Sequence, residues 1–329
     1  MSVLIAVNYH YLRPRFDGPY AGIHGSTPEQ FRDQLEMLGQ LGEFVAPDRV
    51  RAAIHGRANL PEVAVLITFD DGLREQWEFA WPVLHGASVP AIFFVNTGPI
   101  EDHTVSVVHK IHLLRSQIPP AEFARYIAER LGRETLESGQ FFDEQAAQRQ
   151  YRYDDDETAR LKYLLNFGLE PTFRDAMIHE LFQEVFTCEA SVSKQLYMGR
   201  EEISSLAEFE AVGSHAHQHA PLARCSMDEA ATLVGDSVDW IEQKTGFRPY
   251  ALSYPYGTRT SVDRRVAEEA KRQGIEFAFT TERAANLDLR RPLFLARFDS
   301  NDVPGGKACS DSPATFIARL PFSDWDDGG

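Results

Sequence analysis

Short apolar runs alternate with longer amphipathic stretches along most of the chain. Six apolar runs have the length and composition of buried strands. They are Val3 to Tyr9, Val63 to Phe69, Ala91 to Val95, Tyr250 to Ser253, Glu276 to Thr280 and Leu293 to Arg297. The amphipathic stretches with helical spacing are Pro28 to Leu41, Leu73 to His85, Met227 to Thr245 and Ser261 to Gln273. Because strands that alternate with helices are typical of a parallel sheet or barrel, the pattern predicts an α/β fold.

The alternation stops in the middle of the chain. From about residue 101 to residue 200 the pattern is helical and carries almost no strand signal. We therefore expect residues 1–329 to form a single barrel with a helical insertion at 101–200. We interpret the insertion as a lid over the site or as an interface between copies in a homo-oligomer. Its acidic run, Asp154 to Glu157, is typical of a solvated helix start rather than of a cation site.

Charge and composition narrow the classes of partner. The chain has 49 acidic and 33 basic side chains, which gives a net charge of −16. Such a surface repels phosphate backbones, so the composition argues against a nucleic-acid partner. Three separated cysteines predict neither a disulfide framework nor a cysteine-type zinc site.

The N-terminal apolar run is interpreted as a buried strand and not as a signal peptide. Asn8 and His10 interrupt it, and no basic leader precedes it. No stretch of the sequence approaches the roughly 20 apolar residues that span a membrane. We therefore expect a cytoplasmic protein without a membrane span.

Three polar clusters directly follow three predicted strands. Asp70-Asp71-Gly72 follows the second apolar run, His215-Ala216-His217-Gln218-His219 follows Ala211 to Ser214, and Tyr254-Pro255-Tyr256-Gly257 follows Tyr250 to Ser253. In parallel α/β folds the carboxyl ends of the strands share one rim, and active sites lie there. We therefore expect these three clusters to meet at a single site.

The histidine cluster predicts a metal site. If the cluster forms a helical turn, His215 and His219 share a face and reach one ion, while His217 points elsewhere. Asp70 or Asp71 completes a set of two imidazoles and one carboxylate, which suits zinc and also ferrous iron. Adjacent aspartates also divide the work, because one can bind the metal while the other accepts a proton from water.

These clusters resemble the motifs of the polysaccharide deacetylase (NodB-homology) family, carbohydrate esterase family 4. Thr68 to Gly72 resembles the first motif, and Gly213 to His219 resembles the second, in which three residues separate two histidines. Ser253 to Gly257 resembles the third motif, which usually reads Arg-x-Pro-Phe/Tyr. The resemblance covers about residues 1 to 100 and 200 to 300.

The resemblance implies a distorted (β/α) barrel with fewer than eight β/α units. It also implies zinc or another divalent transition metal. The metal ligands that it implies are Asp71, His215 and His219. Asp70 is then the general base, and the backbone N–H of Tyr256, which follows Pro255 of the third motif, helps to hold the oxyanion.

Two positions depart from the motifs. Ser253 stands where the family usually has an arginine that orients the base, and we expect Arg297, at the end of a late strand, to supply that guanidinium. The family's closing Leu-x-x-His motif, which provides the general acid, is missing, because His219 is the last histidine of the chain. The remaining candidates for the acid are His10, His24, His109, His112 and His217. We favour His10, because it follows the first strand and so lies on the same rim.

The leading hypothesis is a metal-dependent N-deacetylase of an N-acetylated amino sugar. We expect a small sugar, or one linked to a nucleotide or lipid, in glycan or secondary-metabolite biosynthesis. A second hypothesis keeps the metal site and replaces the sugar by a cyclic imide, ureide or formamide. A third is a non-catalytic binding module on the same barrel.

Overall fold

The computed structural model describes residues 2–18, 23, 25–131, 144–151 and 154–325. These residues form two compact units. The first comprises Met1–Arg15, Gly25–Thr104 and Ala190–Gly329, and the second comprises Phe16–His24 and Val105–Glu189. The single barrel with an insertion at 101–200 remains a prediction.

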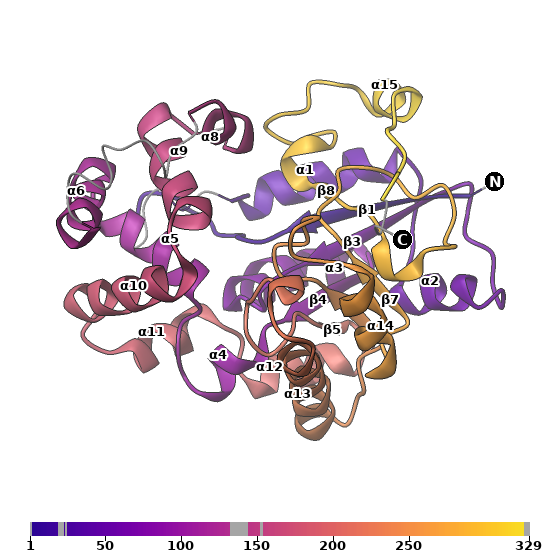
Figure 1. Ribbon diagram of the computed structural model, residues 1–329. Coiled ribbons are helices and arrows are strands. Elements are labelled where there is room, and N and C mark those ends of the chain that lie inside the picture. Colours follow the sequence, from indigo (N-terminus) through magenta and orange to yellow (C-terminus); the bar gives the residue numbers. More distant parts are fainter. Residues whose placement is uncertain (1, 19–22, 24, 132–143, 152–153, 326–329) are drawn as a thin grey trace. The chain divides into compact units, whose positions relative to one another are not determined.

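All eight strands among the described residues belong to the first unit (Figure 1). They are β1 (Val3–Tyr9), β2 (Glu43–Phe44), β3 (Val63–Phe69), β4 (Ala91–Val95), β5 (Val212–Ser214), β6 (Ala251–Ser253), β7 (Phe277–Phe279) and β8 (Phe298–Asp299). The strand pairs are parallel, in the order β7-β6-β5-β4-β3-β1-β8, and β2 pairs with β3 beside this path. The expected parallel α/β barrel is confirmed.

One segment connects the two edges of the sheet. Leu295 donates its backbone N–H to Ala278 of β7 and accepts from Thr280, while Phe298 of β8 pairs with Val7 of β1. The sheet therefore curls into a distorted barrel, and Leu295 to Asp299 closes it. The predicted strand Leu293 to Arg297 is displaced, because a single 3₁₀ turn, η4 (Pro292–Phe294), takes up its first residues.

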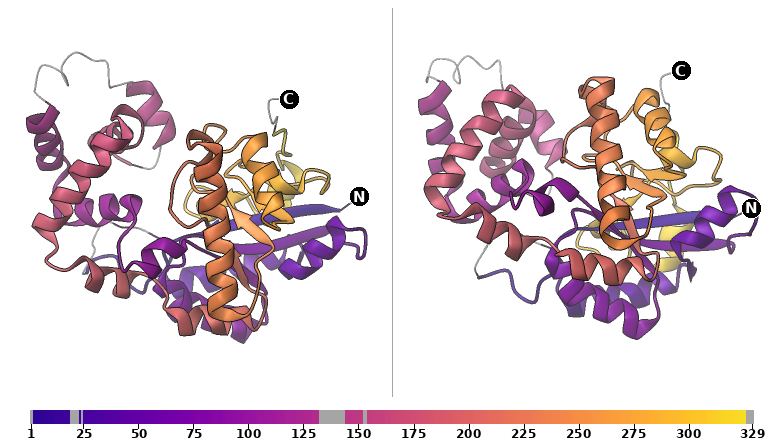
Figure 2. Two further views of the ribbon diagram at one scale, coloured as in Figure 1. Left: turned by 60° about the horizontal axis from the view of Figure 1, so that its bottom comes forward. Right: turned by 90° about the horizontal axis from the view of Figure 1, so that it is seen from below.

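Helices of the first unit surround the strands (Figures 1 and 2). They are α1 (Pro28–Gly39), α2 (Pro47–Ile54), the π-helical turn η1 (Gln76–Ala80), α3 (Trp81–Ala87), α4 (Thr97–Glu101), α12 (Arg200–Ala207), α13 (Met227–Thr245), α14 (Arg264–Arg272) and α15 (Pro313–Ala318), together with α11 (Glu189–Leu196), which starts at the last residue of the second unit. Sequence-encoded caps set several of their starts. Thr27 and Ser226 each form a capping box, as their spacing to Gln30 and Glu229 predicts. The fourth predicted helix, Ser261 to Gln273, begins later than expected, because Asp263 caps α14.

The second unit is helical in its described part. Its helices are α5 (Val107–Gln117), α6 (Pro120–Leu131), α8 (Glu144–Gln150), α9 (Asp156–Tyr163), the π-helical turn η2 (Leu164–Gly168) and α10 (Pro171–Val185). The acidic run behaves as a helix start, since the Asp155 carboxylate accepts from the backbone N–H of Thr158 and caps α9. No helix among the described residues of either unit is long and apolar enough to cross a membrane.

The central strands are apolar on both faces because both faces are covered. In β1, Leu4 and Ala6 pack into the barrel interior with Phe94 and Phe279, whereas Ile5 and Val7 pack into the layer beneath the helices. Two-sided burial explains why these strands read as continuous apolar runs without alternation. The interior is therefore filled, and polar chemistry is confined to the strand ends.

Candidate functional site

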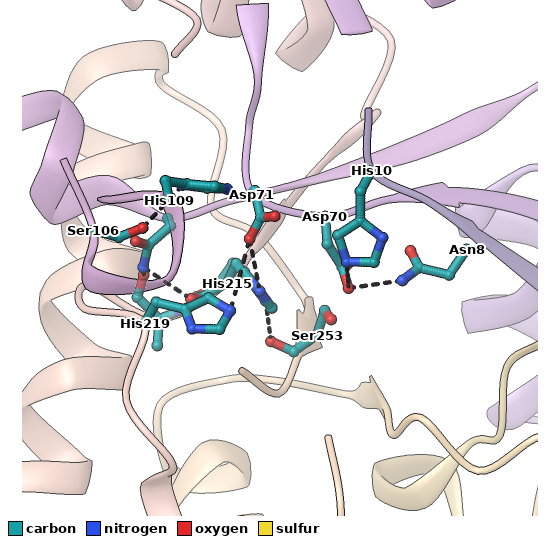
Figure 3. Close-up of polar contacts among 12 residues, drawn as sticks. Asn8, His10, Asp70, Asp71, Ser106, His109, His215, His219 and Ser253 are labelled. Atoms are coloured by element: carbon teal, nitrogen blue, oxygen red, sulfur yellow. Dashed lines mark hydrogen bonds and ion pairs between the residues drawn. The ribbon is translucent and has the colours of Figure 1, made fainter. Parts of the chain in front are cut away.

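The Asp-Asp-Gly turn follows β3 directly. Asp70 donates its backbone N–H to Tyr9 of β1, and Asp71 then adopts a positive φ of 76°. A positive φ is strained for a non-glycine residue and persists only where neighbours hold it. Gly72, with a φ of 65°, completes the turn and accepts from the backbone N–H of Met198. The reversal makes the two neighbouring carboxylates face different partners (Figure 3).

The histidine loop follows β5, and it is not the helical turn that we expected. The backbone N–H of His215 bonds to Val95 of β4, and Ala216 then adopts a positive φ of 58°. His215 and His219 converge because of this bend, and their ring centroids lie 5.1 Å apart. The two rings come together as we expected, but the bend at Ala216 brings them together and not a helical turn.

Asp71, His215 and His219 form one compact group. Their ligand atoms all lie within 4.8 Å of one another. His215 Nε2 is 3.4 Å and His219 Nε2 is 3.7 Å from Asp71 Oδ1. Figure 3 marks both contacts with dashed lines. This group of two imidazoles and one carboxylate oxygen is the only three-residue set of metal-ligand type found among the described residues. It matches the donor set of a catalytic zinc site.

The hydrogen bonding of His215 supports a cation at this group. His215 Nδ1 lies 2.7 Å from the carbonyl oxygen of Ser253, to which it donates. Its Nε2 then presents a lone pair to the oxygen of Asp71, so two acceptors face each other unless a positive charge lies between them. Burial acts to lower the pKa of His215, but Asp70 and Asp71 outweigh it and raise this pKa. The residues present therefore fit a bound divalent metal.

Arg297 holds Asp70 from the opposite side. Its Nη1 and Nη2 donate to the two carboxylate oxygens at 2.9 and 2.8 Å, and Nη2 also donates to Ser253 Oγ at 2.8 Å. The Arg297 side chain is 1% exposed and that of Asp70 is 4% exposed. Burial would raise the pKa of Asp70, but Arg297, with His215 and His10, holds it well below its usual range. Asp70 is thus an oriented, ionised carboxylate.

Arg297 supplies the guanidinium that the third motif lacks in this chain. Ser253 occupies the motif position, and its small side chain leaves room for a guanidinium that enters from the segment closing the barrel. Arg297 accordingly lies where the expectation placed it, although its strand is displaced.

His10 and Tyr256 lie on the same rim. The Nε2 atom of His10 is 3.9 Å from Asp70 Oδ2, and its side chain is 43% exposed. Tyr256, which follows the buried Pro255, has a positive φ of 63°, and its ring packs edge-on against His219 with the ring centroids 4.6 Å apart. The structure therefore gathers the residues that the motifs select from the first unit.

The structure describes three of the other candidate acids, His109, His112 and His217. His217 turns to α4, where its Nδ1 is 3.0 Å from Thr97 Oγ1, and does not join the group around Asp71. His109 and His112 belong to α5 of the second unit, and the Nδ1 of the buried His109 contacts Ser106 Oγ at 2.9 Å. His24 lies outside the described residues.

Two asparagines support the site and were missed in the sequence. Asn8 donates to Asp70 Oδ2 at 3.0 Å and accepts from Arg297. The side-chain amide of Asn96 donates to the carbonyl oxygens of three consecutive residues, His215, Ala216 and His217, at 3.2, 2.9 and 3.2 Å. Each is a polar residue at the end of an apolar strand, and this position is the feature of the sequence that could have identified it.

A parallel barrel that presents two carboxylates and two histidines at its strand ends is typical of metal-dependent hydrolases. The family model described as polysaccharide deacetylase matches residues 57–137 and 184–278. The chain belongs to the polysaccharide deacetylase family.

Individual relatives agree with this family. A stretch of 65 residues is 37% identical to the peptidoglycan-N-acetylmuramic acid deacetylase PdaC of Bacillus subtilis (strain 168), and it covers 20% of this chain and 14% of that protein. The deacetylase PplD of Streptococcus pyogenes, solved with acetate, is 15% identical with a TM-score of 0.57 over 96% of this chain and 97% of that one. IcaB from Ammonifex degensii is 18% identical with a TM-score of 0.54 over 97% of both chains. At these identities the structural likeness concerns the fold.

Proposed function

We propose that the protein is a metal-dependent N-deacetylase of an N-acetylated amino sugar. Its substrate is a small sugar, or a nucleotide- or lipid-linked one, used in glycan or secondary-metabolite biosynthesis. The observation that carries the proposal is the pairing of two sets of groups on one rim. Asp71, His215 and His219 gather three ligand atoms, and Asp70 lies beside them, held by Arg297.

In this proposal Asp71, His215 and His219 hold a divalent metal. When bound, the metal supplies a Lewis acid that polarises the acyl carbonyl and makes water more acidic. Two imidazoles and a carboxylate suit zinc as well as iron, so the metal is to be identified by elemental analysis.

Asp70 acts as the general base. Its carboxylate is ionised and fixed in two directions by Arg297 and Asn8, so it accepts a proton from the attacking water without reorienting. A carboxylate with a lowered pKa is a weak base, and orientation therefore contributes more to its role than basicity does.

His10 and Tyr256 complete the proposed chemistry. The exposed imidazole of His10 gives a proton to the nitrogen of the leaving amine, which must be protonated when the C–N bond breaks. The backbone N–H of Tyr256 donates to the oxyanion that develops on the acyl carbon. The strained backbone at Tyr256 is consistent with a donor held for this purpose.

The test is acetate release by the zinc-loaded protein from N-acetylglucosamine, its nucleotide-diphosphate conjugate and short chitin oligomers. A cyclic imide and a formamide are included in the panel. We expect acetate from at least one N-acetyl sugar, and none after the double change His215→Ala, His219→Ala. A matched double change, His55→Ala at the C-terminal cap of α2 and His85→Ala on α3, should keep the activity. Turnover confined to the imide or formamide would contradict the sugar substrate, and no turnover at all would favour a binding module.

A further inference from the structure

A cavity of about 360 Å³ lies in the first unit, away from the metal-ligand group. It is bounded by α4, α11, α12 and α13 and by Arg74, which follows the Asp-Asp-Gly turn. The cationic side chains that line it are Arg74, Lys194, Arg200 and Lys244. Trp240 and Glu101 also contribute to the lining. A volume of this order is within the range of small-ligand sites, roughly 300 to 1,000 Å³.

The lining of this cavity is positively charged, although the chain as a whole carries a negative net charge. Arg74 pairs with Glu202 at 2.7 Å. Among the described residues, no carboxylate lies within ion-pair distance of Lys194, Arg200 or Lys244. Four cationic side chains therefore meet two carboxylates, Glu101 and Glu202, which leaves a surplus of two positive charges in a chain of net charge −16. Unpaired cations gathered around a concavity favour an anionic ligand.

Three of the four cationic groups make contacts with the cavity walls. Arg74 Nε donates to the carbonyl oxygen of Lys194 at 3.0 Å, and Arg200 Nε donates to that of Lys244 at 3.2 Å. The ammonium group of Lys244 lies 6.0 Å from the centre of the Trp240 ring. These contacts hold the two guanidinium groups and place the ammonium group of Lys244 beside Trp240 before any ligand arrives.

We propose that this cavity is a binding site for a small molecule that carries a diphosphate group. Two adjacent phosphates match the surplus of two positive charges, and guanidinium groups bind phosphate oxygens in pairs. The site is separate from the metal-ligand group, and the proposal does not rest on the proposed deacetylation. The cavity wall nevertheless continues into the catalytic turn, because Met198, which lines it, donates its backbone N–H to Gly72.

The test is calorimetric titration of the full-length protein with inorganic pyrophosphate. The triple change Lys194→Gln, Arg200→Gln, Lys244→Gln should weaken binding at least tenfold. The matched triple change Arg264→Gln, Arg290→Gln, Arg319→Gln removes the same charge at exposed positions outside the cavity and should leave binding within twofold. Because pyrophosphate also binds metals, the Asp71→Asn variant is titrated in parallel and should bind as the wild type does.

Several results would overturn the proposal. Absence of pyrophosphate binding to the wild type at millimolar concentration would do so, as would equal loss in both triple variants, which would indicate general charge attraction. Loss in Asp71→Asn alone would move the binding to the metal-ligand group. Citrate that binds as tightly as pyrophosphate would exclude diphosphate as the preferred ligand.

Discussion

Replacing Arg297 by lysine or by methionine removes the guanidinium from Asp70 in two different ways. Lysine keeps the charge but reaches one carboxylate oxygen instead of two, so one charge-assisted hydrogen bond is lost. Such a bond contributes about 1.5–3 kcal/mol, which corresponds to a roughly 10- to 150-fold decrease in kcat/KM if Asp70 is the base. The decrease should fall mainly on kcat, because the arginine positions the base and does not contact the substrate.

Methionine leaves the Asp70 carboxylate buried without its partner. Removal of one member of a buried ion pair costs about 3–5 kcal/mol of unfolding free energy. The pKa of Asp70 should rise, so the acid limb of the kcat/KM profile should move to higher pH. Acetate release measured against pH, together with urea unfolding, checks both effects, and Arg264→Met on the exposed face of α14 serves as the control. Activity within twofold of the wild type and an unchanged pH profile in both Arg297 variants would refute the role of Arg297.

Three further changes test the structure around the site. In the metal-free protein, the unfolding free energy of the wild type should rise between about pH 2 and pH 4 more steeply than that of Asp70→Asn, by up to about 1.4 kcal/mol per pH unit. The pKa of Asp70 is lowered in the folded protein, so the unfolded chain takes up this proton first as the pH falls. Equal slopes for the two proteins in urea titrations would contradict the ion pair. Asn96→Ala removes three hydrogen bonds from the histidine loop and should weaken zinc affinity roughly 10- to 100-fold in competition with a chelator, whereas unchanged affinity would mean that the loop holds itself. Gly213→Ala places a Cβ 2.4 Å from the ring of Phe94 and should cost about 1–3 kcal/mol of unfolding free energy. Gly86→Ala, with no neighbour within 4 Å, should cost nothing, and equal effects of the two glycine changes would refute the packing argument.

The strands were predictable because they are buried on both faces. Val3–Tyr9, Val63–Phe69 and Ala91–Val95 have the bounds that their apolar runs indicate. The two-residue strand β2 was missed, since a pair such as Glu43-Phe44 carries no periodicity. The late strand was misplaced because Pro292 starts a 3₁₀ turn within its apolar run.

The site residues were accessible to sequence analysis through local motifs, but their geometry was not. The convergence of His215 and His219 depends on the left-handed backbone at Ala216, a residue type that gives no sign of it. The contact between Arg297 and Asp70 spans 227 positions and is set by closure of the barrel. Asn8 and Asn96 act through hydrogen bonds that only the folded chain defines.

The most direct test of the account is elemental analysis of the purified protein beside an Asp71→Ala, His215→Ala double variant. The proposed metal site predicts about one equivalent of zinc or another transition metal in the wild type and in the His55→Ala, His85→Ala control, and none in the double variant. A metal-free wild type, or a double variant that retains its metal, would contradict it.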